Sequence, residues 1–336
     1  MNLLLVGAEQ VKKDEGYLDE ISWSFQKAFG KLGAKTEYFI YRKAGFLKFL
    51  EKDKHIKGKW HSLMNKMLVK HTIRKKPDIL LILKGETILG DSLRAIRRKT
   101  DTLIINIFPD NPILMGRFDA IEPCHYYFIK DTYIFELLRK IGLKNIYYLP
   151  QCTDPEVYEP MCLNEKDLDI FSNDVSLIGS MYPYRLKFIQ EILDLKPAIW
   201  GKGWLKSSDQ KIIELCRGKD IRGTQKAKAI SGSAISLNPH HPLNDIHGVN
   251  RRTYDIAACR GFQLADYKVD MEKMFKLNDE IICFKTIEEL KKNVEYYLKH
   301  PDERTQIAEA ARQRVMREHT YDHRAKEILE IIASNN

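Results

Sequence analysis

Short apolar runs that alternate with helical segments are the feature that most limits what this chain can fold into. In the first half, runs with the length and composition of β-strands lie at 3–8, 36–41, 78–85, 102–108, 125–130 and 145–150. Between them, apolar residues recur at three- and four-residue spacing, as at Tyr17, Ile21, Phe25 and Phe29. This alternation predicts an α/β fold with parallel, doubly wound sheets.

A polar stretch with prolines, residues 151–169, interrupts the alternation. Strand-like runs then restart as VSLIGS, AIWGKG, SAISLN, GFQLAD and EIICF. A chain of 336 residues is long enough for two hydrophobic cores. We therefore expect two sheet domains in series, at 1–160 and 161–320, followed by a last helix at 321–336.

Composition indicates an ordinary folded protein, with 44% hydrophobic and 30% charged residues. No apolar run approaches the roughly 18 to 20 residues of a membrane span, and MNLLLVGA lacks the features of a signal peptide. We therefore expect a cytoplasmic protein.

The formal charge of +9 is concentrated partly in His55–Lys76, which alternates basic and apolar residues. Two interpretations stay open for this segment. It is either a surface for anionic lipid, acidic glycan or nucleic acid, or an amphipathic helix whose solvated face is basic. Peripheral contact with the inner face of a membrane fits the first interpretation, and nucleic acid is the partner we least expect.

The segment His247–Asp266, HGVNRRTYDIAACRGFQLAD, is the most informative for function. A basic pair enters a helix whose first N–H groups have no partner and whose dipole attracts anions. Arg251 and Arg252 lie beside that helix end. Asp255, one turn further on, is suited to accept hydrogen bonds from sugar hydroxyls. The segment predicts a site for a phosphorylated ligand.

The order of residues in this segment resembles the sugar-nucleotide signature of the CgeB-like glycosyltransferases, which are relatives of the group 1 glycosyltransferases. The matching positions are Asn250, Arg252, Tyr254, Asp255, Cys259 and Gly261. The resemblance continues through residues 279–324 and includes 174–185 and 199–204. Family members usually carry Glu at the position of Asp255. They also usually have Cys directly followed by Gly, whereas here Arg260 lies between Cys259 and Gly261. Either change bears on the choice of donor, and neither argues against the fold.

The resemblance implies a GT-B architecture, in which two Rossmann-like domains face a cleft and the last helix crosses back to the first domain. It also implies transfer of a sugar from a nucleoside diphosphate to an acceptor hydroxyl on a glycan, a lipid-linked sugar or a protein. The first domain would bind the acceptor and the second the donor. The family works without a metal ion or another cofactor, and relatives suggest retention of anomeric configuration.

Ligands of open α/β sheets bind beyond the carboxyl ends of the strands. By this rule and the resemblance, the expected donor-binding residues are Gly7, Gly179, Ser180, Arg185, Trp200, Gly201, Asn250, Arg252, Tyr254 and Asp255. Arg185 is expected to contact the donor phosphates, because a guanidinium matches phosphate oxygens. Trp200 suits either the nucleotide base or the core, and Gly7 suits either a ligand-facing turn or a plain one.

Two residues are candidates for catalysis. Asp110 follows an apolar strand and is suited to position or deprotonate the acceptor hydroxyl, although Asp-Asn-Pro is also common in turns. His240, just past SAISLN, is suited to hydrogen-bond the donor sugar or to pack a loop. His241 and His247 lie nearby, but no Cys or Asp at ligand spacing supports a metal site. We also expect all six cysteines to be free thiols.

Two other functions stay open at the level of sequence. One is a non-catalytic protein that binds sugar nucleotides or polyanions, which Asp255, Arg260 and the basic first domain favour. The other is a nucleotide-sugar epimerase on the same fold.

Overall fold

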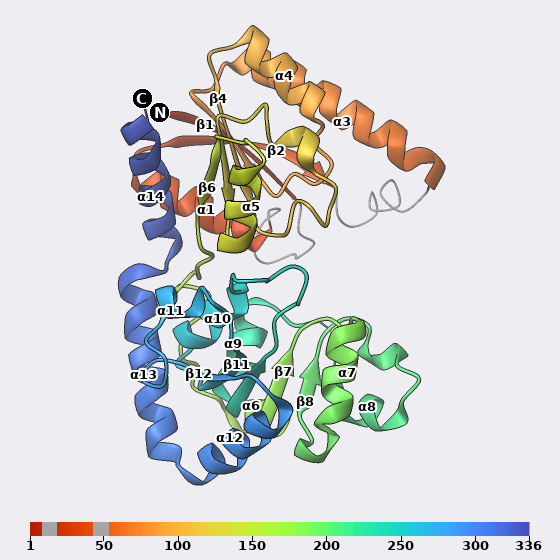
Figure 1. Cartoon of the computed structure of the whole chain (residues 1–336), viewed down its shortest axis with the longest axis vertical. Coiled ribbons are helices and arrows are strands. Elements are labelled where there is room, and N and C mark those ends of the chain that lie inside the picture. The colour runs from red at the N-terminus through yellow and green to blue at the C-terminus, as the bar shows by residue number, and fades with distance from the viewer. Residues whose placement is uncertain (9–18, 43–53, 219, 336) are drawn as a thin grey trace. The chain divides into compact units, whose positions relative to one another are not determined.

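The computed structural model describes residues 1–8, 19–42, 54–218 and 220–335 (Figure 1). The chain divides into two compact units, which are Met1–Pro150 with Tyr321–Asn336 (unit 1) and Gln151–Thr320 (unit 2). Each unit is built on its own six-stranded sheet, in which every neighbouring pair of strands is parallel. The prediction of two doubly wound, Rossmann-like sheets is confirmed.

Unit 1 has the strand order β2-β1-β3-β4-β5-β6. Its strands are β1 (Asn2–Ala8), β2 (Lys35–Arg42), β3 (Ile79–Leu83), β4 (Leu103–Phe108), β5 (Tyr126–Ile129) and β6 (Ile146–Tyr148). Its helices are α1 (Glu20–Lys31), α3 (Lys54–Lys75), α4 (Gly90–Lys99), the 3₁₀ turn η2 (Phe118–Ala120), α5 (Thr132–Lys140) and α14 (Tyr321–Asn335). Every strand expected in the first half is present. Tyr17, expected in a helix, lies outside the described residues.

The last helix, α14, is part of unit 1 and packs against α1 (Figure 1). The rings of Phe25 and Tyr321 meet edge to face with 4.9 Å between centroids. Lys31 and Asp322 form an ion pair at 2.8 Å, and the Tyr126 hydroxyl donates to the Ile332 carbonyl at 3.4 Å. These contacts tie the end of the chain to the first sheet.

Unit 2 has the strand order β12-β11-β10-β7-β8-β9. Its strands are β7 (Asn173–Ile178), β8 (Ala198–Trp200), β9 (Cys216–Gly218), β10 (Ser233–Asn238), β11 (Gln263–Asp266) and β12 (Ile282–Phe284). The strand β9 was not predicted, because its three residues include no apolar run and form the edge of the sheet. The other strands of this unit match the expected runs.

The helices of unit 2 cover its sheet and bury its apolar face. They are α6 (Glu165–Phe171), α7 (Pro183–Glu191), η3 (Leu193–Leu195), η4 (Trp204–Lys206), α8 (Gln210–Leu215), α9 (Gly223–Ser231), α10 (Arg251–Ala258), α11 (Met271–Met274), α12 (Ile287–Lys299) and α13 (Pro301–Glu318). The core between sheet and helices includes Leu177, Ile199, Trp204 and Leu237, all fully buried.

The topology marks where a ligand of unit 2 is expected. The first strand of the unit, β7, has β8 on one side and β10 on the other, so the order of strands reverses between β7 and β10. In doubly wound sheets the ligand crevice opens beyond the carboxyl ends of the strands at this switch point. The loops after Ile178 and Asn238 therefore contain the residues of interest.

Candidate functional site

The loops that follow β7 and β8 are held together by backbone hydrogen bonds. The Gly179 N–H donates to the Trp200 carbonyl at 2.8 Å, and the Met181 N–H donates to the Lys202 carbonyl at 2.8 Å. Gly201 has a φ of +155°, and a Cβ there would lie 2.1 Å from the Gly179 oxygen. Only glycine allows so close a backbone approach, which gives the sequence-predicted Gly201 its physical role.

Two arginines from different helices converge on Gly179. Arg185 lies in the first turn of α7, and Arg252 lies in the first turn of α10. If Gly179 carried a Cβ, that atom would lie 2.6 Å from Nη1 of Arg252 and 2.7 Å from Nη1 of Arg185. The fold therefore brings together three residues that sequence analysis had placed in the donor site.

Arg252 is fixed by a set of acceptors at the carboxyl ends of β7 and β10. Its Nε donates to Oδ1 of Asn238 at 2.9 Å, Nη1 to the Ile178 carbonyl at 2.5 Å and Nη2 to the Pro239 carbonyl at 3.1 Å. Asn250 caps α10 by accepting from the Thr253 N–H, and its side-chain amide donates to Asn238 at 3.0 Å. The cap therefore orients the helix end on which Arg252 is carried.

Arg185 is 6% exposed and is also held by carbonyl oxygens. Its Nη1 donates to Ser180 at 2.7 Å and its Nη2 to Pro239 at 3.2 Å, while its Nε has no hydrogen-bond partner among the described residues. The guanidinium lies 4.3 Å from the centroid of the Tyr182 ring, and that ring contacts His241. One donor of a buried cation thus has no acceptor within the part of the chain that the structure describes.

The two guanidiniums give this edge of the sheet a positive charge. Within the described residues, neither forms an ion pair with a carboxylate. Burial lowers the pKa of Arg185, and burial together with the charge of Arg185 lowers the pKa of Arg252 to about 9. Arg252 is still cationic at neutral pH. An anion placed between the two would relieve both the desolvation and the repulsion.

His240 lies behind this edge and is fully buried. Its Nδ1 is 2.6 Å from Oδ1 of Asp266, its Nε2 is 3.4 Å from the Thr253 hydroxyl, and its backbone N–H donates to the same Asp266 oxygen at 2.7 Å. Burial opposes ionisation of Asp266, but His240 and Lys268 outweigh it and lower the pKa of that carboxyl. Both ring nitrogens of His240 are engaged, which suits positioning of the loop rather than direct contact with a sugar.

Asp255 does not face solvent and is paired inside unit 2. Its carboxylate is fully buried and accepts hydrogen bonds from the Thr153 hydroxyl at 2.7 Å and from Nζ of Lys226 at 2.5 Å. Nζ of Lys226 also lies 4.6 Å from the centroid of the Tyr158 ring. The shorter aspartate, expected to reach sugar hydroxyls, is thus engaged by protein groups. Lys226 and Thr153 were not predicted, because no local motif links them to Asp255.

Two aromatic candidates are packing residues of unit 2. Trp200 is 1% exposed and lies against Phe171, with 6.0 Å between ring centroids. Tyr254 is fully buried between Phe275 and His319. Neither ring is exposed enough to stack on a nucleotide base. Of the two interpretations of Trp200, the structure agrees with a place in the core.

Gly7 and Asp110 belong to unit 1, whereas the residues gathered at Gly179 belong to unit 2. A Cβ on Gly7 would lie 2.2 Å from Oγ of Ser22, so this glycine lets α1 pack closely on β1. Asp110 follows β4 and forms an ion pair at 2.8 Å with Lys84, which follows β3. Both ends of this pair are partly exposed at the carboxyl edge of the sheet.

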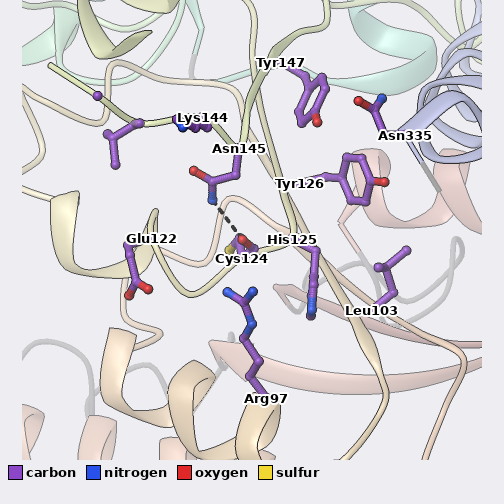
Figure 2. A pocket seen from close by; sticks show the side chains of 12 residues that line it. Arg97, Leu103, Glu122, Cys124, His125, Tyr126, Lys144, Asn145, Tyr147 and Asn335 are labelled. Carbon is purple, nitrogen blue, oxygen red and sulfur yellow. Dashed lines mark hydrogen bonds between the residues drawn. The ribbon is translucent and has the colours of Figure 1, made fainter. Parts of the chain in front are cut away.

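A separate cavity of about 550 Å³ opens at the opposite edge of the unit 1 sheet, near the amino ends of β4, β5 and β6. Figure 2 shows Arg97, Glu122, His125 and Asn145 around it, with Asn145 donating to the Cys124 carbonyl. Burial, with a smaller effect of Arg97, lowers the pKa of His125. The cavity contains none of the sequence-predicted site residues.

Comparison with known proteins relates this chain to glycosyltransferases. Residues 185–330 match a family model described as glycosyl transferase-like. The spore protein CgeB of Bacillus subtilis (strain 168) is 23% identical over 264 residues, which cover 74% of this chain and 80% of CgeB. Both matches support the resemblance of this chain to the CgeB-like group 1 glycosyltransferases. The matched range contains both ends of the Arg185–Arg252 pair.

Solved structures share the fold of this chain over nearly its whole length. Sucrose-phosphate synthase from Thermosynechococcus elongatus superposes with a TM-score of 0.74 at 9% identity, covering 99% of this chain and 98% of that one. HepE of Anabaena, in complex with UDP-glucose, superposes with a TM-score of 0.69 at 12% identity, covering 99% and 100%. These likenesses confirm the GT-B fold class.

Proposed function

We propose that this glycosyltransferase takes its sugar from a nucleoside diphosphate sugar and that unit 2 binds the diphosphate beside Gly179. The observation that carries the proposal is the pair of guanidiniums, Arg185 and Arg252, which meet at the switch point of the sheet and, among the described residues, donate to amide carbonyls and not to carboxylates. Guanidinium forks match phosphate oxygens in geometry and charge. The complex of HepE with UDP-glucose supports the same class of donor.

The same pair provides a reason for metal-independent transfer. As the glycosidic bond breaks, negative charge develops on the leaving diphosphate, and fixed cations aimed at that charge lower the barrier. Arg185 and Arg252 are held in place before the reaction by Ser180, Asn238 and Pro239. We propose that they neutralise the leaving group, with no metal ion or other cofactor required. Retention of the anomeric configuration is proposed from the family resemblance.

For the acceptor we propose unit 1, with Asp110 at the carboxyl end of β4 as the residue that positions the acceptor hydroxyl. Its ion pair with Lys84 fixes the carboxylate, and its partial exposure leaves it open to a ligand. The acceptor is a hydroxyl of a glycan, a lipid-linked sugar or a protein. In unit 2, His240 is proposed to position the loop at Pro239 through its bond to Asp266.

A screen of nucleotides tests the donor class. We expect UDP, GDP or dTDP, or one of their sugars, to raise the melting temperature of the protein without added metal, because a ligand of the native state stabilises it. Gly179→Ala should abolish the shift, since its Cβ displaces both guanidiniums. Gly30→Ala, where a Cβ meets open space, is the matched control. If no nucleotide stabilises the parent, the donor proposal fails; stabilisation without sugar transfer to any acceptor would favour a binding protein.

Binding of the nucleoside diphosphate is also expected to depend on pH. Since the pKa of Arg252 is about 9 in the free protein, the guanidinium loses its proton as the pH rises through that value. Affinity should be constant up to about pH 8 and then fall by up to about tenfold per pH unit. Burial raises the pKa of Tyr182, so its hydroxyl stays neutral over this range. Titration calorimetry at pH 7.5, 9 and 10 measures the effect, and equal affinities would contradict it.

A further inference from the structure

The long helix α3 of unit 1 is basic along its whole length. It carries Lys54, Lys57, Lys59, Lys66, Lys70, Arg74 and Lys75, and its sequence contains no Asp or Glu. Figure 1 shows it lying along one side of unit 1, beside α4. Met64, Leu68 and Thr72 are buried and attach the helix to the rest of the unit. One face therefore anchors α3, and the other remains at the surface.

The exposed face of α3 mixes cations with large apolar side chains. Residues at three- and four-residue spacing share a helix face, and here Lys59, Leu63, Lys66, Met67, Lys70 and Arg74 are all exposed. We call these six residues the α3 outer face. Leu63 and Met67 are each 48% exposed and lie among the charges. Such a face repels itself electrostatically and leaves apolar surface in water, and an anionic apolar partner would relieve both.

We propose that the α3 outer face docks the transferase onto the surface of a bilayer that contains anionic phospholipid. Lysines and arginines near such a surface are attracted to its phosphate headgroups, while neighbouring apolar side chains enter the boundary with the acyl chains. Lys59 and Lys70 have stems long enough to keep their ammonium groups at headgroup level while Leu63 and Met67 go deeper. None of the described helices is long and apolar enough to span a membrane.

The two apolar residues decide between lipid and other polyanions. An acidic polysaccharide or a nucleic acid would be held by the cations alone, through phosphate or carboxylate contacts that need no Leu or Met. A lipid surface uses both kinds of side chain. The formal charge of +9 for the whole chain favours any anionic surface and so does not discriminate between these partners.

Cosedimentation of the full-length protein with sucrose-loaded vesicles tests the proposal. We expect binding to vesicles of phosphatidylcholine with 30% phosphatidylglycerol (roughly the anionic content needed for a strong surface potential) and little binding to phosphatidylcholine alone. Each lysine near the surface accounts for about fivefold in affinity. The triple variant Lys59→Glu/Lys66→Glu/Lys70→Glu should therefore bind at least about 100-fold more weakly. Leu63→Ser/Met67→Ser should lose roughly tenfold.

Matched changes in unit 2 serve as controls. Lys187→Glu/Lys206→Glu/Lys211→Glu alters the net charge equally, and Leu168→Ser/Ile170→Ser removes apolar side chains of similar exposure. Both controls should bind vesicles like the parent, and all variants should melt at the parent temperature. Equal loss in the charge control would show a general charge effect and overturn the proposal. A different result would assign the α3 outer face to an acidic polysaccharide instead. In that case Leu63→Ser/Met67→Ser would bind vesicles with unchanged affinity, and the lysine variant would no longer be retained on heparin.

Discussion

Replacing Lys226 with alanine is expected to lower the melting temperature of unit 2 by about 10 °C. The change leaves the carboxylate of Asp255 fully buried without its closest cation, which lies at 2.5 Å. Removing one partner of a buried ion pair lowers the free energy of unfolding by about 3–5 kcal/mol. For a unit of this size, each kcal/mol lowers the melting temperature by a few degrees. Differential scanning calorimetry or circular dichroism measures the shift.

Two further variants separate charge from packing. Lys228→Ala changes another lysine of α9 whose ion pair with Asp167, at 2.8 Å, is partly exposed, and it should cost less than about 1 kcal/mol. Adding Asp255→Asn to Lys226→Ala removes the buried negative charge, which keeps Arg251 at 3.4 Å as a more distant cation, and should restore at least half of the lost stability. A melting temperature within about 2 °C of the parent for Lys226→Ala would show that the pair does not stabilise α10.

Replacing Arg252 with alanine is expected to reduce kcat/KM for the sugar donor by roughly 100- to 1,000-fold. Arg252 is proposed to donate to the diphosphate in the ground state and to neutralise its charge as the glycosidic bond breaks. Loss of a fixed donor aimed at developing charge has effects of this size, and charge-assisted hydrogen bonds add about 1.5–3 kcal/mol. Transfer kinetics with the nucleotide sugar identified in the thermal screen provide the measurement.

The control for this variant is Arg317→Ala, because Arg317 is an exposed arginine of the same unit that pairs with Glu318. It should leave kcat/KM within about twofold of the parent. Arg252 also holds the Ile178 and Pro239 carbonyls, so each variant is compared at a temperature at which circular dichroism shows it fully folded. An Arg252→Ala protein that is folded and retains kcat/KM within threefold, about 0.65 kcal/mol, would remove Arg252 from the donor site.

The strands were the most predictable part of the molecule, for a physical reason. A parallel strand covered on both faces is apolar at nearly every position, as in Ile79–Leu83, so composition alone marks it. The edge strand Cys216–Gly218 escapes this rule because it is short and only partly covered. The prediction for α3 was also incomplete, since its pattern allowed either a solvated face or a docking surface.

The site was predictable where the topology of the sheet determines proximity. Arg252 lies far along the chain from Gly179 and Arg185, but strand ends at a switch point bring the three together. Burial could not be predicted in the same way. Whether Asp255 faces a ligand or Lys226 depends on how α9 packs against α10, which no local pattern encodes. The same holds for the packing of Tyr254.

The route of the chain has a consequence for how the protein is made. Unit 2 is contiguous, whereas unit 1 needs its last helix, α14, to cover α1 through Tyr321 and Asp322. During synthesis, the second unit therefore has all its residues before the first does. Until α14 has been synthesised, the apolar surface of α1 that it covers stays exposed. A fragment cut at Pro150 would keep that surface exposed and would be prone to aggregation. For expression of unit 1 alone, residues 321–336 should therefore be joined to it.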